Sequence, residues 1–456
     1  MRPFSSAFPA PLKWFLAVPV VGALLAPARA WPEPGRLAVD PVASTVEGVG
    51  GRADLHEPQV TIADLDLGLI AGSSRWDHDG DGVSWNDTYV GFLRDAAGVV
   101  HVFSVRERIY FNDNIQFLHD ISPSQAVVGA NLFRRLFRSL PFLWTPEHGY
   151  RFLPTPCSPR PRPRQPCSGT AAAVSANGRI VAGHVTSPPP AAVRAARWSV
   201  RRSGDPPRLA LRLLSSPRAG SRAWDVSADG RVIVGETLSG ELQPRAALWE
   251  RGRRRRDLAV GEASTASFVA ADGSAALGWS ELEGRRVLVR WSRAGEATIA
   301  TPPEGYDLAS LRAVNPTATA AVGALSRDGN WAPFVWTSRR GFTVIEELGR
   351  EEDYDRSEAL DVSDGGRAVV GVLQSSFVNE GDPPSLAFVW TAASGLTTLN
   401  DLVAGAGVED VDLYHAVAIS GEARQLLATG DPARAPGDTS SLLITLARPL
   451  DRARRR

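Results

Sequence analysis

Net charge, lysine, cysteine and long apolar runs are all scarce in this chain of 456 residues. Its 50 basic and 50 acidic residues balance to a formal net charge of zero, which argues against a nucleic-acid partner. After residue 30 no run of about 18 apolar residues occurs, so we expect no membrane span. A hydrophobic fraction of 43% and a charged fraction of 22% exclude a disordered, fibrous or multispanning chain.

The sequence signatures of common catalytic sites are also missing. There is no G-x-S-x-G nucleophile elbow, no H-E-x-x-H zinc motif, no phosphate-binding loop and no G-x-G-x-x-G fingerprint. The seven histidines show no ligand spacing, and we interpret the pair His119-Asp120 and His148 as surface or loop residues. These absences lower the expectation of an enzyme without removing it, because several distant segments can assemble one site.

Only one lysine, Lys13, is present, so nearly all basic residues are arginine. The arginine runs at 253–256 and in the basic tail 451–456 are interpreted as solvated surface. Adhesion to an anionic envelope or glycan is the alternative.

The first 30 residues predict a cleaved secretory signal peptide. Arg2 and Lys13 precede an apolar run over 14–26, and residues 28–30 read Ala-Arg-Ala, a small-x-small cleavage site. The apolar run is short for a bilayer span, although an uncleaved N-terminal anchor is the alternative. Trp31 excludes a lipid-anchored cysteine at that position. We therefore expect a secreted or periplasmic protein.

Two cysteines, Cys157 and Cys167, are the only ones in the chain. An even count in an exported protein predicts one disulfide, which here closes a small proline-rich loop. Their spacing does not fit a C-x-x-C redox or zinc site. The alternative is two free thiols, which an oxidising compartment disfavours.

One sequence motif recurs eight times. Clear copies, such as V-S-A-D-G-R-V-I-V-G, begin at 174, 226, 269, 314 and 362, and fainter copies begin at 63, 121 and 419. Their mean spacing is about 51 residues, a period typical of propellers and solenoids.

A tryptophan follows the motif in most copies. Six of the thirteen tryptophans stand in this one register: Trp144, Trp198, Trp249, Trp291, Trp336 and Trp390. Arg94 takes the place of tryptophan in the first copy, and the last copy reads S-S-L-L-I-T-L at 440–446. We expect the tryptophans to pack between neighbouring repeats.

Each copy predicts four short antiparallel strands. Asn177-Gly178 and Asp229-Gly230 accept the positive φ of a tight hairpin turn. The apolar run after the turn is typical of a strand buried on both faces, and the tryptophan strand and a fourth strand, as at 342–345, follow. Four such strands make a propeller blade.

The sequence thus predicts an all-β fold with a single β-propeller over residues 31–450, preceded by the signal peptide 1–30. Eight four-stranded blades are expected, with seven as the alternative. Because the last copy lacks a fourth strand after Leu446, residues 37–49 are predicted to supply it and close the ring.

The paired motifs resemble the extracellular HAF-type repeat of exported bacterial proteins, over roughly residues 60–446. The resemblance lies in the alternation of V-S-x-D/N-G-R-V-V-G with A-F-x-W-x-x-x-x-G, followed by Leu348-Gly349. The histidine of the naming triplet is absent, since the site reads Leu386-Ala387-Phe388. The resemblance implies a propeller and an exported context, and it attaches no catalytic residue.

A D-x-D-x-D-G segment in the first repeat predicts a calcium site. The carboxylates of Asp77, Asp79 and Asp81 alternate, so they can converge on one hard cation, and the carbonyl of Val83 would be the next ligand. Asp87 is the substitute for the missing bidentate glutamate. The segment is similar to calcium loops of integrin-like blades, and a structural Ca²⁺ ion is expected there. A solvated acidic turn is the alternative.

Two acidic patterns are interpreted as structural. The Ser-x-Asp-Gly turns are similar to the Asp-box of sialidases, but glycine follows aspartate directly and no tryptophan stands at the required distance. Asp225 and Asp361 recur at the ends of first strands, and we interpret them as supporting the turns rather than as catalysts.

The function predicted from the sequence is that of an exported, non-enzymatic binding module for an extracellular or envelope protein or glycan. We expect a monomer, with Trp76 and Trp85 in the long insertion of the first repeat contacting the partner. The alternative function is that of a propeller hydrolase or lyase acting on an extracellular polymer.

Overall fold

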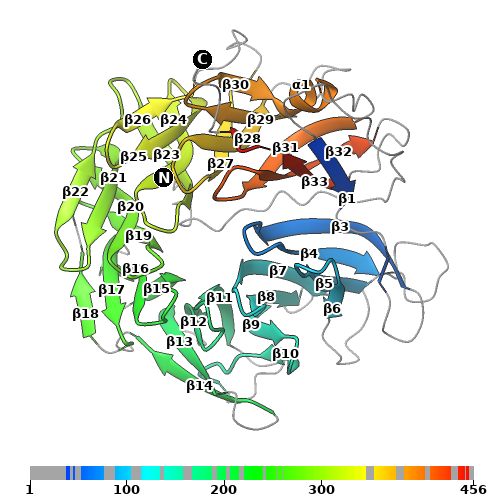
Figure 1. The fold of residues 1–456 in the computed structure, drawn as a ribbon. Coiled ribbons are helices and arrows are strands. Elements are labelled where there is room, and N and C mark those ends of the chain that lie inside the picture. The colour runs from blue at the N-terminus through cyan, green and yellow to red at the C-terminus, as the bar shows by residue number, and fades with distance from the viewer. Residues whose placement is uncertain are drawn as a thin grey trace, which may run out of the picture.

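The structure is a computed structural model. It describes residues 37–41, 45–46, 53–76, 88–103, 114–133, 138–157, 167–186, 193–201, 206–214, 220–239, 243–252, 254–258, 260–345, 354–375, 385–405, 411–432, 440–446 and 448–450. The strands form eight sheets set around a central axis. The fold is an eight-bladed β-propeller (Figure 1), as the repeat count predicted, and the seven-bladed alternative is wrong.

The blades follow one another in chain order, and the first strand of each blade lies nearest the axis. Blade 1 contains β3 (Ala53–Asp64), β4 (Leu69–Trp76), β5 (Thr88–Arg94) and β6 (Val100–Phe103), with the short β2 (Thr45–Val46) beside the start of β3. Blade 2 contains β7 (Asn114–Ile121), β8 (Val127–Phe133), β9 (Arg138–Thr145) and β10 (Gly149–Phe152). Blade 3 contains β11 (Ser168–Val174), β12 (Ile180–Thr186), β13 (Arg194–Arg201) and β14 (Arg208–Leu213).

The middle blades repeat the same antiparallel order. Blade 4 contains β15 (Ser221–Val226), β16 (Val232–Leu238), β17 (Pro244–Glu250) and β18 (Arg254–Asp257). Blade 5 contains β19 (Ser264–Val269), β20 (Ala275–Leu282), β21 (Arg285–Ser292) and β22 (Ala297–Ala300). Blade 6 contains β23 (Asp307–Val314), β24 (Ala320–Arg327), β25 (Asn330–Thr337) and β26 (Gly341–Val344). Blade 7 contains β27 (Glu358–Val362), β28 (Ala368–Gln374), β29 (Ser385–Thr391) and β30 (Gly395–Thr398).

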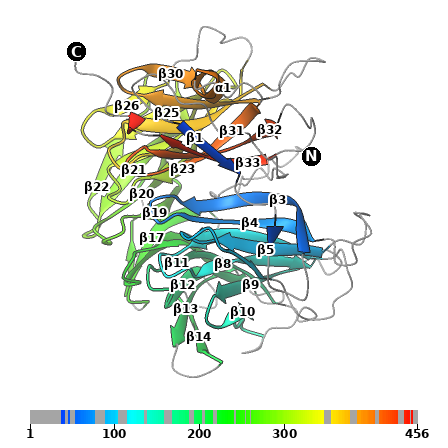
Figure 2. The same ribbon diagram turned by 45° about the vertical axis from the view of Figure 1, so that its right-hand side comes forward.

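Blade 8 is built from both ends of the chain. Its first three strands are β31 (Val411–Ile419), β32 (Gln425–Pro432) and β33 (Ser440–Leu446). The fourth is the N-terminal β1 (Leu37–Pro41), which pairs antiparallel with β33 from Leu37 opposite Leu446 to Pro41 opposite Leu442 (Figures 1 and 2). The predicted closure of the ring by the N-terminal segment is confirmed, and the pairing strand is shorter than the predicted 37–49.

The motif turns have a shared geometry, illustrated by the turn of blade 4. Ser227 Oγ donates to Asp229 Oδ1 at 2.7 Å and accepts the backbone N–H of Val232 at 3.0 Å. Gly230 has a φ of 71°, and a Cβ at this position would lie 2.5 Å from Ile180 Cγ1 of blade 3. Glycine is therefore needed here both for its left-handed backbone and for the close approach of the next blade. The interpretation of these turns as structural is confirmed.

The tryptophan register forms the core between blades. Trp198, Trp249 and Trp291 are at most 1% exposed, and Trp144 and Trp336 are buried as well. Trp249 of blade 4 packs with the alanines and Ile180 of blade 3. Trp390 is only half-buried. This arrangement explains why a single blade cannot fold alone, since its tryptophan face is covered only by the neighbouring blade.

Among the described residues the α-helix is α1 (Leu399–Ala404), a short helix after β30 whose first turn is capped by Thr398. Within the described ranges no helix has the length and apolar character that a bilayer crossing requires.

Candidate functional site

The two faces of the propeller are built from different connections. The motif turns join the first and second strands of every blade, so all of them lie on one face, which we call the turn face. The connections between second and third strands, and between successive blades, lie on the opposite face, which we call the loop face. Trp76 at the end of β4 and Thr88 at the start of β5 are directly paired on the loop face.

On the turn face, hydrogen bonds link one motif turn to the next. Ala176 donates its backbone N–H to the carbonyl of Ala228 at 3.0 Å, Ala228 donates to Ala271 at 2.9 Å, and Ala271 donates to Pro316 at 2.8 Å. Asp364 likewise donates to the carbonyl of Gly421 at 3.1 Å. We call this circular series of bonds between the motif turns the girdle.

Where proline removes the donor, another group of the same turn replaces it. Pro316 has no N–H, and the Nδ2 of Asn315 donates to the carbonyl of Asp364 at 2.7 Å instead. Pro123 has no N–H either, and the backbone N–H of Ser124 donates to the carbonyl of Ala176 at 3.2 Å. The girdle is thus maintained by different residue types at equivalent positions.

The girdle closes between blades 8 and 1 on a side chain. Gly421 donates its backbone N–H to both carboxylate oxygens of Asp66, at 3.0 and 2.9 Å. Burial raises the pKa of the nearby Asp364 and Asp64 carboxyls, and the charge of Asp66 raises both further. Three carboxyl groups, those of Asp64, Asp66 and Asp364, therefore lie close enough at the seam for their charges to interact.

A second set of acids ties first strands together across blade junctions. Asp225 accepts the N–H of Val226 on Oδ1 at 2.7 Å, and that of Val269 in the next blade on Oδ2 at 2.8 Å. Asp361 accepts the N–H of Val362 and that of Ile419 in blade 8. Asp120 accepts the N–H of Ile121 and that of Val174 in blade 3. These acids hold neighbouring blades together at β-bulges, rather than only supporting their own turns.

Sequence reasoning missed part of this column. Asp120 belongs to it, and its signal was present in the register of the second motif copy. The interpretation of His119 as a surface or loop residue is wrong: it lies in β7, is 6% exposed, and its Nδ1 bonds the carbonyl of Ala171 at 2.8 Å. His148 is a turn residue after β9, as expected.

The first strands enclose a central channel with a cavity volume of about 1590 Å³. Its lining comes from all eight blades, with apolar residues such as Val174, Val226 and Val362 alternating with the bridging aspartates. Toward the loop face the lining changes character, because Trp279, Arg286, Trp331 and Arg356 border the cavity there. This end of the channel is the candidate site, and we call it the mouth.

Arginine side chains lie over aromatic rings at the mouth and beside it. The guanidinium carbon of Arg286 is 4.6 Å from the ring centroid of Trp279, and that of Arg356 is 5.4 Å from Trp331. Beside the mouth, Arg327 is 4.8 Å from the ring of Tyr306. None of these three arginines forms an ion pair with a residue that the structure describes. At these distances each guanidinium makes a cation–π contact with its ring, and the guanidinium plane carries N–H donors in a fixed fork.

Another arginine of the channel wall is paired with an acid. Arg312 Nη2 lies 2.6 Å from Glu358 Oε2, and Ser310 donates to the other oxygen of Glu358. Glu358 is buried, so this pair belongs to the wall between blades. The channel lining therefore contains two kinds of arginine, one paired with an acid and one that lies over an aromatic ring.

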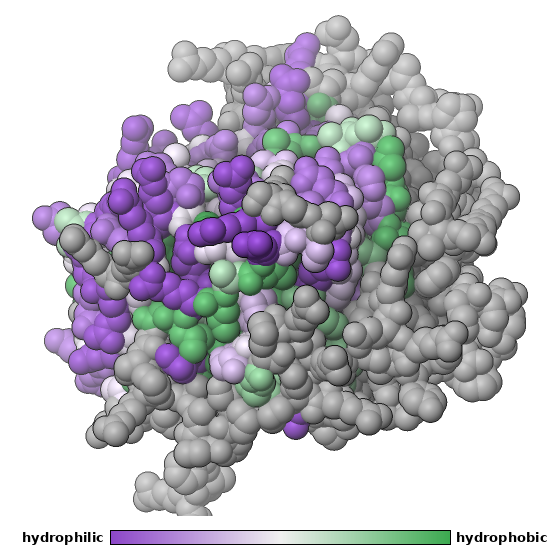
Figure 3. Space-filling view, turned by 90° about the horizontal axis from the view of Figure 1, so that it is seen from below, coloured by the Kyte–Doolittle hydropathy of each residue, from purple (hydrophilic) through white to green (hydrophobic). Residues whose placement is uncertain are grey.

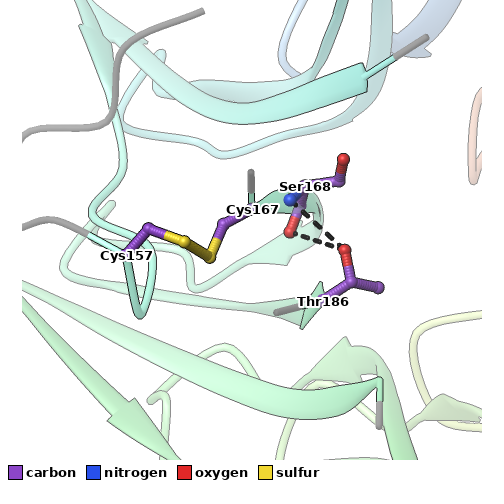
Figure 4. Close-up of a disulfide and its surroundings, with 4 residues drawn as sticks. All are labelled: Cys157, Cys167, Ser168 and Thr186. Carbon is purple, nitrogen blue, oxygen red and sulfur yellow. Dashed lines mark hydrogen bonds between the residues drawn. A yellow bond between two sulfur atoms is a disulfide. The ribbon is translucent and has the colours of Figure 1, made fainter. Parts of the chain in front are cut away.

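The predicted disulfide is present on the loop face. Cys157 and Cys167 are bonded, with their Cα atoms 5.9 Å apart. Figure 4 shows that the bond lies next to Ser168, whose backbone N–H and carbonyl both bond Thr186 Oγ1. The bond thus fastens the connection between blades 2 and 3 to the beginning of β11.

The other predicted site residues belong to the insertion of the first repeat. Asp77, Asp79, Asp81, Val83 and Asp87 of the predicted calcium loop lie outside the described residues, and so does Trp85. The backbone of Trp76 ends β4 on the loop face. Among the residues that the structure does describe, no group of three or more metal-ligating side chains converges.

The arginine run near 253–256 lies on the outer edge of blade 4, in β18. Arg255 and Arg256 are exposed, and Arg255 pairs with Asp257 at 2.9 Å. Figure 3 views the molecule from below and shows hydrophilic residues gathered mainly on its left, the side where Figure 1 places β18 and β22. Arg255 and Arg256 are thus at the solvated surface, as the sequence predicted, and Arg253 lies outside the described residues.

No family model and no curated protein matches the sequence, but many solved structures share its fold. The Dos1 propeller has a TM-score of 0.50 and 13% identity, covering 89% of this chain and 94% of its own. A prolyl endopeptidase gives 0.51 at 10% identity, covering 86% of this chain and 54% of that one. Dipeptidyl peptidase 4 of Porphyromonas gingivalis gives 0.50 at 12%, with 86% and 59% covered.

At these identities the similarity shows the fold alone. The chain spans little more than half the length of either peptidase. The fold and its channel therefore define the protein as a β-propeller.

Proposed function

We propose that this protein is an exported, non-enzymatic binding module that holds an extracellular or envelope partner at the mouth of its channel. The observation that carries the proposal is the pair of arginine–tryptophan stacks, Arg286 on Trp279 and Arg356 on Trp331, at the border of the cavity. Tryptophan, tyrosine and arginine are the residue types enriched at the centres of binding interfaces. A rigid ring of blades presents them with little loss of conformational entropy on binding.

The hydrogen bonds of Asp225 and Asp361 in the channel wall favour binding over catalysis. A hydrolase or lyase would need carboxylates available to the substrate, whereas Asp225 and Asp361 each accept backbone N–H bonds on both oxygens. Such bonds stabilise the charged form and hold the carboxylate against the wall. Hydrolysis or lysis of a polymer is thus the less supported alternative.

An exported location is part of the proposal. The disulfide between Cys157 and Cys167 suits an oxidising compartment, and residues 1–30 have the pattern of a secretory signal. The resemblance to HAF-type repeats favours the same context. The predicted calcium loop 77–87 and the predicted contact residues Trp76 and Trp85 remain part of the proposal.

Binding of the mature chain to arrays of envelope proteins and glycans tests the proposal. We expect at least one reproducible ligand, lost in Trp331→Ala and weakened by deletion of 74–88. The matched control is Ile299→Ala, because Ile299 is an exposed apolar residue on the outer strand β22. Binding that is the same in wild type and Trp331→Ala would contradict the mouth as the site. Turnover of a ligand that is lost in Asp225→Asn or Asp361→Asn would favour the enzyme.

A further inference from the structure

We infer that the ligand of the mouth is an acidic polysaccharide, whose carboxylates are held by Arg286 and Arg356. This inference rests on the proposed binding function and names its ligand class. The two arginines stand on either side of β23, since Arg286 belongs to β21 of blade 5 and Arg356 immediately precedes β27 of blade 7.

The first step is that these guanidinium groups are available. Two neighbouring arginines are paired with acids and are not available to a ligand. Arg285 lies 3.3 Å from Asp307, and Arg312 lies 2.6 Å from Glu358. Arg286 and Arg356 are exposed and have no described acid within ion-pair distance. Their in-plane donors suit the two oxygens of a carboxylate.

The second step concerns the aromatic rings. A neutral sugar is held in many sites by stacking on a bare aromatic face, but here guanidinium groups lie over Trp279 and Trp331. The surface that a ligand meets at these positions is therefore cationic and hydrogen-bonding. An anionic ligand gains from both properties, and a neutral one would have to displace the arginines first.

The third step concerns the rest of the lining and the size of the space. Ser326 and Gln374 border the cavity at the loop-face ends of β24 and β28, and Glu281, the strand partner of Arg286, borders it as well without reaching ion-pair distance. A sugar acid carries hydroxyl groups beside each carboxylate, which suits the side chains of Ser326 and Gln374. The volume of about 1590 Å³ belongs to the whole channel, whose deeper lining carries carboxylates such as Asp225 and Asp361, so an acidic chain is expected to lie across the arginines of the mouth and not to enter the channel.

The test is binding of the mature chain to alginate and polygalacturonate by isothermal titration calorimetry. The comparison ligands are fully methyl-esterified polygalacturonate, dextran, poly-glutamate and inorganic phosphate. We expect the two carboxylated polysaccharides to bind in a salt-dependent manner, and the ester and dextran to bind at least about tenfold more weakly. The double variant Arg286→Gln plus Arg356→Gln should reduce the affinity at least about tenfold. The single variant Arg286→Lys should retain only part of the affinity. The control is Arg208→Gln, because Arg208 is an exposed arginine on the outer strand β14.

Each contrary result has a distinct meaning. If neither acidic polysaccharide binds, or if the methyl ester binds equally well, the inferred ligand class is wrong. If poly-glutamate binds more tightly than the polysaccharides, the partner is an acidic protein segment. If phosphate alone competes at equal charge concentration, the site recognises phosphate rather than sugar carboxylates. Binding of a neutral glycan or a protein that depends on Trp331 would preserve the proposed function while rejecting the acidic class. Circular dichroism of each variant separates lost binding from lost folding.

Discussion

The carboxylate of Asp66 accepts the backbone N–H of Gly421 on both oxygens, at 3.0 and 2.9 Å, although the two residues are 355 positions apart. The other described links of the girdle end on a backbone carbonyl. At the seam between blades 8 and 1, a side chain from the first blade takes that place. Together with the pairing of β1 with β33, this bond joins the beginning of the ring to its end.

Removal of the seam acceptor should loosen the ring. We expect Asp66→Ala to lower the free energy of unfolding by about 1 kcal/mol, a typical value for one hydrogen bond, and to speed hydrogen exchange of the Gly421 amide. Chemical denaturation and exchange mass spectrometry measure the two effects. Glu304→Ala, at an exposed position, is the control. An Asp66→Ala protein with unchanged exchange at Gly421 would show that the bond does not hold the seam.

Loss of a core tryptophan should cost far more. Trp249 is 1% exposed and packs between blades 3 and 4, so Trp249→Ala is expected to lower the free energy of unfolding by about 3–5 kcal/mol. Trp85→Ala, in the insertion of the first repeat, should have little effect. Urea denaturation of both variants makes the comparison. Equal losses would mean that the tryptophan register is not what holds the blades together.

Two half-buried histidines whose Nδ1 atoms are buried should make the fold sensitive to acid. Burial, helped by Arg222 and His119, lowers the pKa of His184 from 6.5 to about 3, and burial lowers the pKa of His415 to about 4. Both are held neutral in the folded protein, so their contribution is complete above pH 6.5. It is lost as the pH falls from 6.5 toward 4 for His415 and toward 3 for His184. The slope is about 1.4 kcal/mol per pH unit for each histidine within its window.

This pH dependence is measured by chemical denaturation between pH 7.5 and 4.5. The variant His184→Gln should have a smaller decrease in stability over this range than the wild type. Carboxylates such as Asp229 titrate in both proteins, so the difference between the two curves isolates His184. Parallel curves would mean that His184 is not kept neutral by the fold.

The disulfide should stabilise the fold by a limited amount. Closing so short a loop is worth at most about 3 kcal/mol in the chain-entropy model, and the prolines between Cys157 and Cys167 already restrict the reduced chain. Denaturation with and without reductant measures the difference, with Cys157→Ser plus Cys167→Ser as the unlinked reference. Mass mapping without reduction that finds both thiols free would contradict the bond.

Calcium should stabilise the protein through the loop 77–87. A site with a dissociation constant of about 0.1–1 mM would contribute about 1 kcal/mol at about 2 mM calcium. Thermal unfolding in calcium and in chelator measures the shift, which Asp79→Ala should abolish. Asp412→Ala, at an exposed aspartate of β31, should keep it. Identical melting temperatures of the wild type with and without calcium would contradict the predicted calcium site.

The sequence by itself determined the number of blades, the position of the turns, the buried tryptophan register and the closure by an N-terminal strand. The first three features recur with a period of about 51 residues, and the N-terminal strand completes an unfinished repeat. All of them depend on local contacts and on burial between similar neighbouring units. Sequence reasoning placed Cys157 and Cys167 together for a similar reason, because they are close along the chain and Cys157 therefore reaches Cys167 in almost any fold of the loop.

Only the tertiary structure decided which polar side chains meet. Asp225 bonds Val269 in the next blade, His119 is buried against Ala171, and Arg356 lies over Trp331 of the preceding blade. Such pairs arise where non-repeated residues of different blades are brought together at the distance that the packed tryptophans and alanines impose. The repeat pattern of the sequence does not predict that distance, because the distance is set by how closely the blades pack around the ring.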